Sequence, residues 1–183
     1  MIKMRCFIAI DLPAEIKEEL LKIQESIPKD IAKFKLVEKE NLHLTIRFLG
    51  EISDSEITKV KEALKLLSYK RFTASLSKIG VFPSFSYIKV VWVGLEPEKQ
   101  IKELRDNTEK LLTQSGFPAD ERFEAHLTIA RVKSIKDKAA FAKKVNDIQT
   151  KPLFFDINSI KLKKSTLTKQ GPIYEDVFEV KLR

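Results

Sequence analysis

The tetrapeptide His-Leu-Thr-Ile occurs twice and contains the only two histidines of the chain, His43 and His126. Histidine suits proton transfer because its unperturbed pKa lies close to neutrality. If each tetrapeptide forms a strand, His43 and Thr45 share one face, as do His126 and Thr128, because side chains two residues apart point the same way. Two imidazoles and two hydroxyls around a tetrahedral phosphate could hold its oxygens, activate water and protonate the leaving oxygen. The pattern therefore predicts acid–base catalysis without a covalent intermediate.

The elements that position these residues follow the same order twice, as strand, helix, strand, helix and strand. Asp11-Leu12-Pro13 opens one helix and Leu95-Glu96-Pro97 opens another, at nearly the same distance ahead of the two histidines. The sequence thus predicts one domain, residues 1–183, with an internal repeat of approximately 1–89 and 90–183. Two similar lobes would meet along a pseudo-two-fold axis and place the histidines opposite each other across a cleft.

Apolar patterning and turn residues set the expected boundaries. Strands are predicted at 5–10, 42–49, 72–79, 87–95, 123–132, 153–162 and 177–182, with a short extended segment at 36–37. Helices are predicted to begin at Pro13, at Ser53 or Asp54, at Pro97 and at Asp137. Loops are expected at 83–86 and around 171–172.

Composition indicates a globular protein and leaves two interpretations of its positive charge. The formal net charge of +8 over 183 residues favours nucleic acid as an anionic partner. A heat-adapted, lysine-rich surface is an equally open interpretation, because the chain has only four Asn, five Gln and five Gly. The single Cys6 excludes an intramolecular disulfide, and we recognise neither a signal peptide nor a membrane span. We therefore expect a cytoplasmic protein without membrane contact.

A metal site is the alternative interpretation of the two histidines. Glu124 shares a strand face with His126, so His43, His126 and Glu124 could form a three-ligand set. The chain has no His-Glu-x-x-His motif and no cysteine cluster, and Asn41 occupies the position before His43 that corresponds to Glu124. We therefore expect neither a metal nor another cofactor.

Four segments carry a family resemblance: residues 5–10, 43–50, 126–131 and 171–174. Together they resemble the 2H phosphoesterases, within them the RNA 2′,3′-cyclic phosphodiesterase group, also called 2′-5′ RNA ligase or ThpR/LigT-like. The resemblance implies a bilobal α+β fold with antiparallel sheets lining a central cleft and helices outside. It also implies metal-independent hydrolysis of a terminal 2′,3′-cyclic phosphate on RNA to a 2′-phosphate. In such an enzyme the first histidine, here His43, is the proton donor and the second, His126, is the proton acceptor.

Further residues are candidates for substrate binding. Arg131 could pair with a phosphate, but strand alternation places it opposite to His126, so a bend would be needed. Arg47 has the alternation of His43 and Thr45 and could bind the phosphate too, and the alternative is that it lies beyond the cleft. Phe48 and Tyr174 could stack on a base, although core packing is favoured for Phe48.

The resemblance also implies the partner, RNA with 2′,3′-cyclic phosphate ends, with tRNA halves as one source, acted on by a monomer. The same groups could run the reverse reaction and join a cyclic end to a 5′-hydroxyl. Two other functions stay open. One is a cyclic phosphodiesterase acting on small nucleotides, and the other is a catalytically weak RNA-binding protein.

Overall fold

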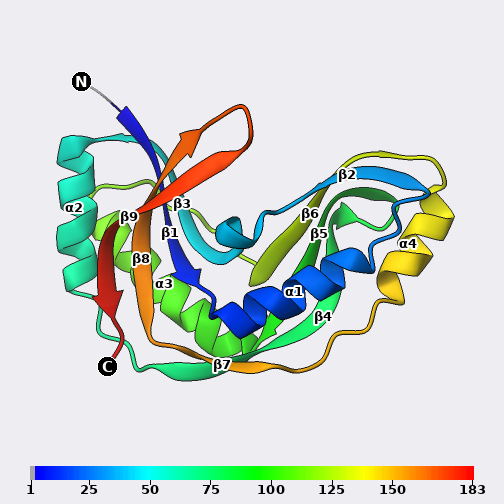
Figure 1. The fold of residues 1–183 in the computed structure, drawn as a ribbon. Helices are drawn as coiled ribbons and strands as arrows, with labels where there is room; N and C mark the ends of the chain where they lie inside the picture. The colour runs from blue at the N-terminus through cyan, green and yellow to red at the C-terminus, as the bar shows by residue number, and fades with distance from the viewer. Residues whose placement is uncertain (1–2) are drawn as a thin grey trace.

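The structure, a computed structural model, describes residues 3–183 and is built from two antiparallel sheets with helices packed outside them (Figure 1). The first sheet has the strand order β3 (His43–Ser53), β1 (Lys3–Asp11), β8 (Ser159–Leu167) and β9 (Pro172–Lys181). The second sheet has the order β2 (Ala32–Leu36), β6 (His126–Ile135), β5 (Tyr87–Glu96), β4 (Phe72–Ser84) and β7 (Phe154–Ile157). The helices are α1 (Ala14–Glu25), α2 (Asp54–Lys65), α3 (Glu98–Gln114) and α4 (Lys138–Asn146), with a short 3₁₀ turn, η1 (Lys39–Asn41).

The two repeats occupy equivalent places, and the predicted bilobal α+β fold is confirmed. β1 pairs with β3 in the first sheet as β5 pairs with β6 in the second, so each histidine begins a strand beside the opening strand of its own repeat. However, each sheet contains strands from both halves of the chain. β4 from the first half pairs with β5, and β8 from the second half pairs with β1. Each sheet is therefore completed by a strand from the other half of the chain.

Several expected boundaries are wrong. β2 and β9 begin earlier than expected, at Ala32 and Pro172, and β6 begins later, at His126. The segment expected as one strand at 153–162 forms two strands in different sheets, β7 and β8, which flank Asn158. The loop expected at 83–86 shrinks to a two-residue turn, because Pro83 continues β4 next to a register shift. A strand tolerates proline at such an irregular position, where a regular ladder bond is not required.

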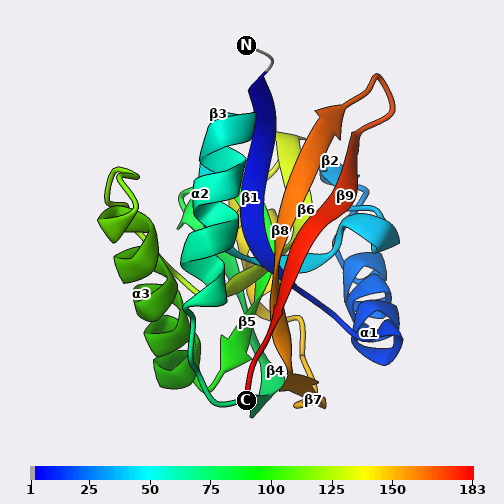
Figure 2. The ribbon, with the colours of Figure 1, turned by 90° about the vertical axis from the view of Figure 1, so that its left-hand side faces the viewer.

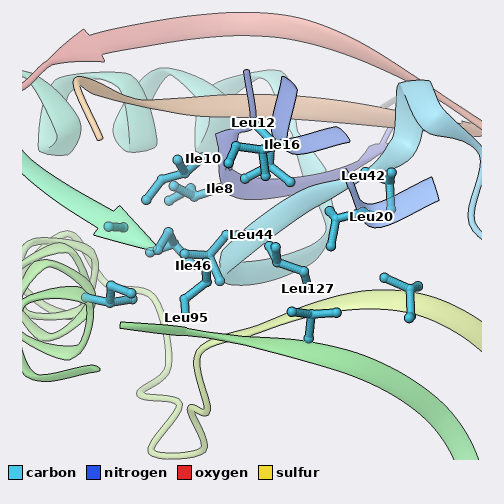
Figure 3. Close-up of a cluster of buried hydrophobic side chains, with 14 of the residues drawn as sticks. Ile8, Ile10, Leu12, Ile16, Leu20, Leu42, Leu44, Ile46, Leu95 and Leu127 are labelled. Carbon is cyan, nitrogen blue, oxygen red and sulfur yellow. The ribbon is translucent and has the colours of Figure 1, made fainter. Parts of the chain in front are cut away.

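The side chains between the histidines and threonines supply the core. Leu44 and Leu127 are both buried, as alternation predicts. They lie in one cluster with apolar residues from both sheets and from α1, and Figure 3 shows this cluster between β1, β3 and β6. Burying a leucine stabilises a fold by about 1.5–3 kcal/mol. The core therefore holds each motif strand in place from behind, while the histidines face the other way.

The helices lie outside the sheets, with α2 and α3 together on one side and α1 on the other (Figure 2). α2 has Ser53, one of the two expected starting residues, as its N-cap. The Ser53 hydroxyl accepts a hydrogen bond from the Glu56 backbone, and the Glu56 carboxylate accepts one from the Ser53 backbone, which forms a capping box. In the part of the chain that the structure describes, no helix combines the length and apolar character needed to cross a membrane.

Candidate active site

The two histidines line one pocket between the sheets, with a volume of about 680 Å³. This is within the range of about 300–1,000 Å³ that is typical of small-molecule sites. His43 and Thr45 come from β3, and His126 and Thr128 come from β6. The repeat thus brings the four residues of the doubled motif to a common cavity.

Each imidazole is oriented by the backbone two residues before it. The Nδ1 atom of His43 lies 2.7 Å from the carbonyl oxygen of Asn41, and Nδ1 of His126 lies 2.6 Å from that of Glu124. A carbonyl can only accept, so Nδ1 carries the proton in both rings. In the neutral rings Nε2 is therefore free to accept a proton, and in His43 it lies 2.9 Å from the Thr45 hydroxyl.

Aromatic rings enclose both histidines. The His43 ring lies 5.0 Å from Phe7 and 5.3 Å from Tyr174, while the His126 ring lies 4.9 Å from Phe82, between ring centroids. Tyr174 and Phe82 each meet the imidazole nearly at right angles. The two histidines thus sit in matching apolar surroundings, one in each lobe.

This enclosure changes the proton affinity of both groups. Burial lowers the pKa of His43 to about 4, against the opposing effect of its hydrogen bond to Asn41. Burial also lowers the pKa of His126, and the bond to Glu124 again opposes the shift. Removing a cationic imidazolium from water is unfavourable, so burial favours the neutral form of both rings in the absence of a ligand.

A β-bulge follows each histidine at the same place. Ile46 of β3 and Ile129 of β6, each three residues after the histidine, are extra residues without partners of their own on the neighbouring β1 and β5. An extra residue shifts the alternation, so side chains beyond the bulge change face.

The bulges revise three of the residue predictions. The prediction that Arg47 lies on the cleft face is wrong: it does not line the pocket, because the bulge at Ile46 turns it away. Core packing of Phe48 is also wrong, since this ring lines the pocket and is 59% exposed. Arg131 receives the bend that it needed from the bulge at Ile129 and lines the pocket, as does Tyr174.

Arg47 instead holds the loop that leads into the second motif. Its guanidinium contacts the Asp120 carboxylate at 2.8 Å and the Glu109 carboxylate at 3.0 Å, and it donates to the Pro118 carbonyl at 2.6 Å. This loop ends at His126. β3, which carries the first histidine, therefore anchors the approach to the second.

The reciprocal contact joins β6 to the loop ahead of His43. The Val37 backbone N–H donates to the carbonyl of the bulge residue Ile129 at 3.0 Å. The buried Gln24 amide of α1 donates to both carbonyls, Val37 and Ile129, at 2.8 Å each. Each motif strand thus holds the loop that precedes the histidine of the other motif.

Sequence patterning missed a ring of four charges beside His43. Lys161 and Lys163 each bridge Asp11 and Asp176, with nitrogen–oxygen distances of 2.6–2.8 Å. Asp11 lies directly opposite His43 in the β1–β3 ladder. Lys163 acts to lower the pKa of His43 and Asp11 acts to raise it, so two members of the ring have opposite effects on this histidine. In the sequence, the ring of charges is visible only as Lys161 and Lys163 at alternate positions of one strand. The same pattern is typical of a strand whose lysines face solvent, so it did not predict the ring.

The alternative metal set is not assembled. Within residues 3–183 no three His, Cys, Asp or Glu side chains gather closely enough to hold a metal ion. Glu124 contributes its backbone carbonyl to His126, as described above.

Sequence comparison places this pocket in a known family. The family model described as LigT like Phosphoesterase matches the chain twice, at residues 10–92 and 93–174. The chain belongs to the LigT-like phosphoesterases. This phosphoesterase is 42% identical over 178 residues to the RNA 2′,3′-cyclic phosphodiesterase of Methanocaldococcus jannaschii, covering 96% of the chain and 99% of the relative. It is 34% identical to the enzyme of the same name from Thermotoga maritima, covering 96% and 94%.

Solved structures have the same fold as this LigT-like phosphoesterase. TT0787 of Thermus thermophilus matches with a TM-score of 0.81 and 25% identity over 98% of both chains. Escherichia coli LigT in its apo form matches with a TM-score of 0.79 and 24% identity, over 100% of this chain and 99% of that one.

Proposed function

We propose that this phosphoesterase hydrolyses the 2′,3′-cyclic phosphate at an RNA end to a 2′-phosphomonoester. The observation that carries the proposal is the pair of imidazoles in one pocket, each with Nδ1 bound to a backbone carbonyl and Nε2 left for proton transfer. The names of the M. jannaschii and T. maritima relatives support RNA ends as the substrate.

In the proposed reaction water attacks phosphorus while the bond to the 3′ oxygen breaks. His126 accepts a proton from the water, and His43 donates one to the departing 3′ oxygen. The Thr45 and Thr128 hydroxyls donate to the non-bridging oxygens. The product carries a 2′-phosphate and a 3′-hydroxyl, and exchange with solvent returns the two histidines to their starting states. A 5′-hydroxyl in place of water would give a 2′,5′-phosphodiester by the same proton transfers.

The low pKa of His43 means that the donor must take up a proton before it acts. An anionic phosphate in the pocket favours the imidazolium form because an opposite charge nearby stabilises it. Substrate binding therefore helps to charge the donor, and no metal or other cofactor is assigned a part in the reaction.

The test is hydrolysis of an oligoribonucleotide ending in a 2′,3′-cyclic phosphate, in the presence of a chelator, with separation of 2′- and 3′-phosphate products. We expect the 2′-phosphate. No turnover, turnover only after metal is added, or a 3′-phosphate product would refute the proposal. His43→Ala and His126→Ala should each reduce kcat by about 10²–10⁴-fold.

The donor and acceptor roles can be separated with a substrate that has sulfur at the bridging 3′ position. A thiolate leaves without protonation, so this substrate should restore much of the activity of the donor variant, His43→Ala, and little of that of His126→Ala. Restoration of His126→Ala instead would reverse the assignment.

The same assays distinguish the other candidate functions. A phosphodiesterase for small nucleotides would prefer 2′,3′-cyclic mononucleotides or ADP-ribose cyclic phosphate over oligonucleotides. A catalytically weak RNA-binding protein would bind RNA equally well after both histidine substitutions and would turn over none of these compounds.

A further inference from the structure

Three cations line the same pocket without being needed for the proton transfers: Arg5, Lys35 and Arg131. Lys35 of β2 and Arg131 of β6 stand directly opposite each other in the second sheet. Arg5 belongs to β1 of the first sheet, where it pairs with Ser165, which in turn pairs with Tyr174. Both sheets therefore contribute positive charge to this cavity.

The cations from the two sheets meet near Tyr174. Burial raises the pKa of the Tyr174 phenol, and the charges of Arg131 and Arg5 both oppose this rise. One hydroxyl is thus within electrostatic reach of a guanidinium from each sheet. The Tyr174 ring also lies 5.3 Å from the His43 ring, so the cations are close to the reacting centre.

These cations are not neutralised by the protein. Among residues 3–183, no carboxylate lies within 4.0 Å of the charged groups of Arg5, Lys35 or Arg131, whereas Arg47 and Arg105 are both paired. Like charges directly opposite in a ladder are destabilising, so the Lys35–Arg131 pair has an electrostatic cost within the second sheet.

Lys35 retains donors for a ligand. One proton of its ammonium is donated to the Gln170 carbonyl at 2.9 Å, which leaves two of three free. Glu38 is the acidic side chain among the residues that line the pocket. An excess of positive charge inside a concave site is suited to binding an anion. Cations that only face solvent would not need to gather in a pocket.

The position of the cations relative to His43 suggests which anion. Arg5 lies two residues from Phe7 on the same face of β1, a step of about 7 Å, and the Phe7 ring packs against His43. The charge of Arg5 is therefore displaced from His43 along β1 by a distance suited to a neighbouring phosphate group. Arg131 lies nearer to the reacting phosphate, because its charge acts to lower the pKa of His126.

We propose that Arg5, Lys35 and Arg131 form a second anion subsite, which binds the internucleotide phosphate on the 5′ side of the nucleotide that carries the cyclic phosphate. The inference rests on the proposed function and narrows its substrate class to oligoribonucleotides of two or more residues. A 2′,3′-cyclic mononucleotide leaves this subsite empty.

The test compares two dinucleotides with a 2′,3′-cyclic end, one with a natural phosphodiester linkage and one with a neutral methylphosphonate linkage. We expect the natural compound to have a kcat/KM about 10- to 100-fold higher, the range for hydrogen bonds between charged partners. Arg5→Gln and Lys35→Gln should each reduce this ratio severalfold. The exposed lysine on the outer helix α2 gives the control Lys59→Gln, which has the same change of net charge and should keep both the ratio and the activity.

Equal kcat/KM values for the two linkages, or ratios unaffected by Arg5→Gln and Lys35→Gln, would overturn the subsite while leaving the proposed function intact. If neither dinucleotide is turned over, the proposed function fails, and calorimetric affinities for the corresponding 2′-phosphate products decide the subsite. A lower Kd for the natural linkage that is lost in Arg5→Gln supports it, and equal Kd values overturn it.

Discussion

Gln24 offers a sharp test of how the second motif is held. Its side-chain amide is 2% exposed and donates to the carbonyls of Val37 and Ile129, which joins α1, the loop ahead of His43 and the bulge in β6. Gln24→Met removes both donors while keeping an unbranched side chain that suits a helix. The Ile129 carbonyl still accepts from the Val37 backbone, but the Val37 carbonyl loses its bond from Gln24.

The expected loss follows from these two bonds. Each contributes about 1 kcal/mol, and an unsatisfied carbonyl adds about 1–3 kcal/mol, so Gln24→Met should lower the free energy of unfolding by about 3–5 kcal/mol. For a chain of this size that corresponds to a fall in Tm of about 6–20 °C. We also expect KM to rise more than kcat falls, because Arg131 depends on the bulge whereas His126 precedes it.

The assays are denaturant unfolding and steady-state kinetics on the cyclic-phosphate RNA. Gln114→Met, at an exposed position at the end of α3, is the matched control and should stay within about 0.5 kcal/mol of the parent. A Gln24→Met protein as stable as the control, with an unchanged KM, would refute the reasoning about the bulge.

Other predictions concern the electrostatics and packing around the histidines. With the pKa of His43 at about 4 and that of His126 below 6.5, the productive form, donor protonated and acceptor neutral, becomes scarcer as the pH rises. Log kcat/KM should therefore fall with a slope near −1 above about pH 6.5, and a flat profile from pH 7 to 9 would contradict this. NMR titration of the imidazoles should show a lower pKa of His43 in Asp11→Asn and a higher one in Lys163→Met; shifts of the same sign would exclude the charge ring as their cause. A Cβ at position 80 would lie 2.1 Å from the indole of Trp92, so Gly80→Ala should cost about 1–3 kcal/mol in thermal unfolding, and a parent-like Tm would show that the ring moves freely.

The sequence was sufficient for the parts of the site that depend on repetition and regular alternation. The doubled motif placed Thr45 and Thr128 with the histidines and sent Leu44 to the core, because these residues lie before the bulges. Arg47 could not be placed, since an extra residue in a strand leaves the hydrophobic pattern almost unchanged.

The bulges and the pairing of distant strands could not be predicted from the sequence pattern. In β6 the adjacent buried residues Ile129 and Ala130 interrupt alternation and could have indicated the bulge, but β3 has no comparable sign. The exchange of β4 and β8 between the sheets was equally hidden, because each has an ordinary strand pattern whichever neighbour it pairs with.

The reciprocal anchoring of the two loops has a consequence for how the protein can fail. Arg47 ties the approach to His126 onto β3, and Ile129 with Gln24 ties the approach to His43 onto β6. Neither half of the chain contains all the contacts that fix its own histidine. Neither half of the chain should therefore fold into an active unit when it is expressed alone. Heating should abolish catalysis and unfold the protein in one cooperative transition.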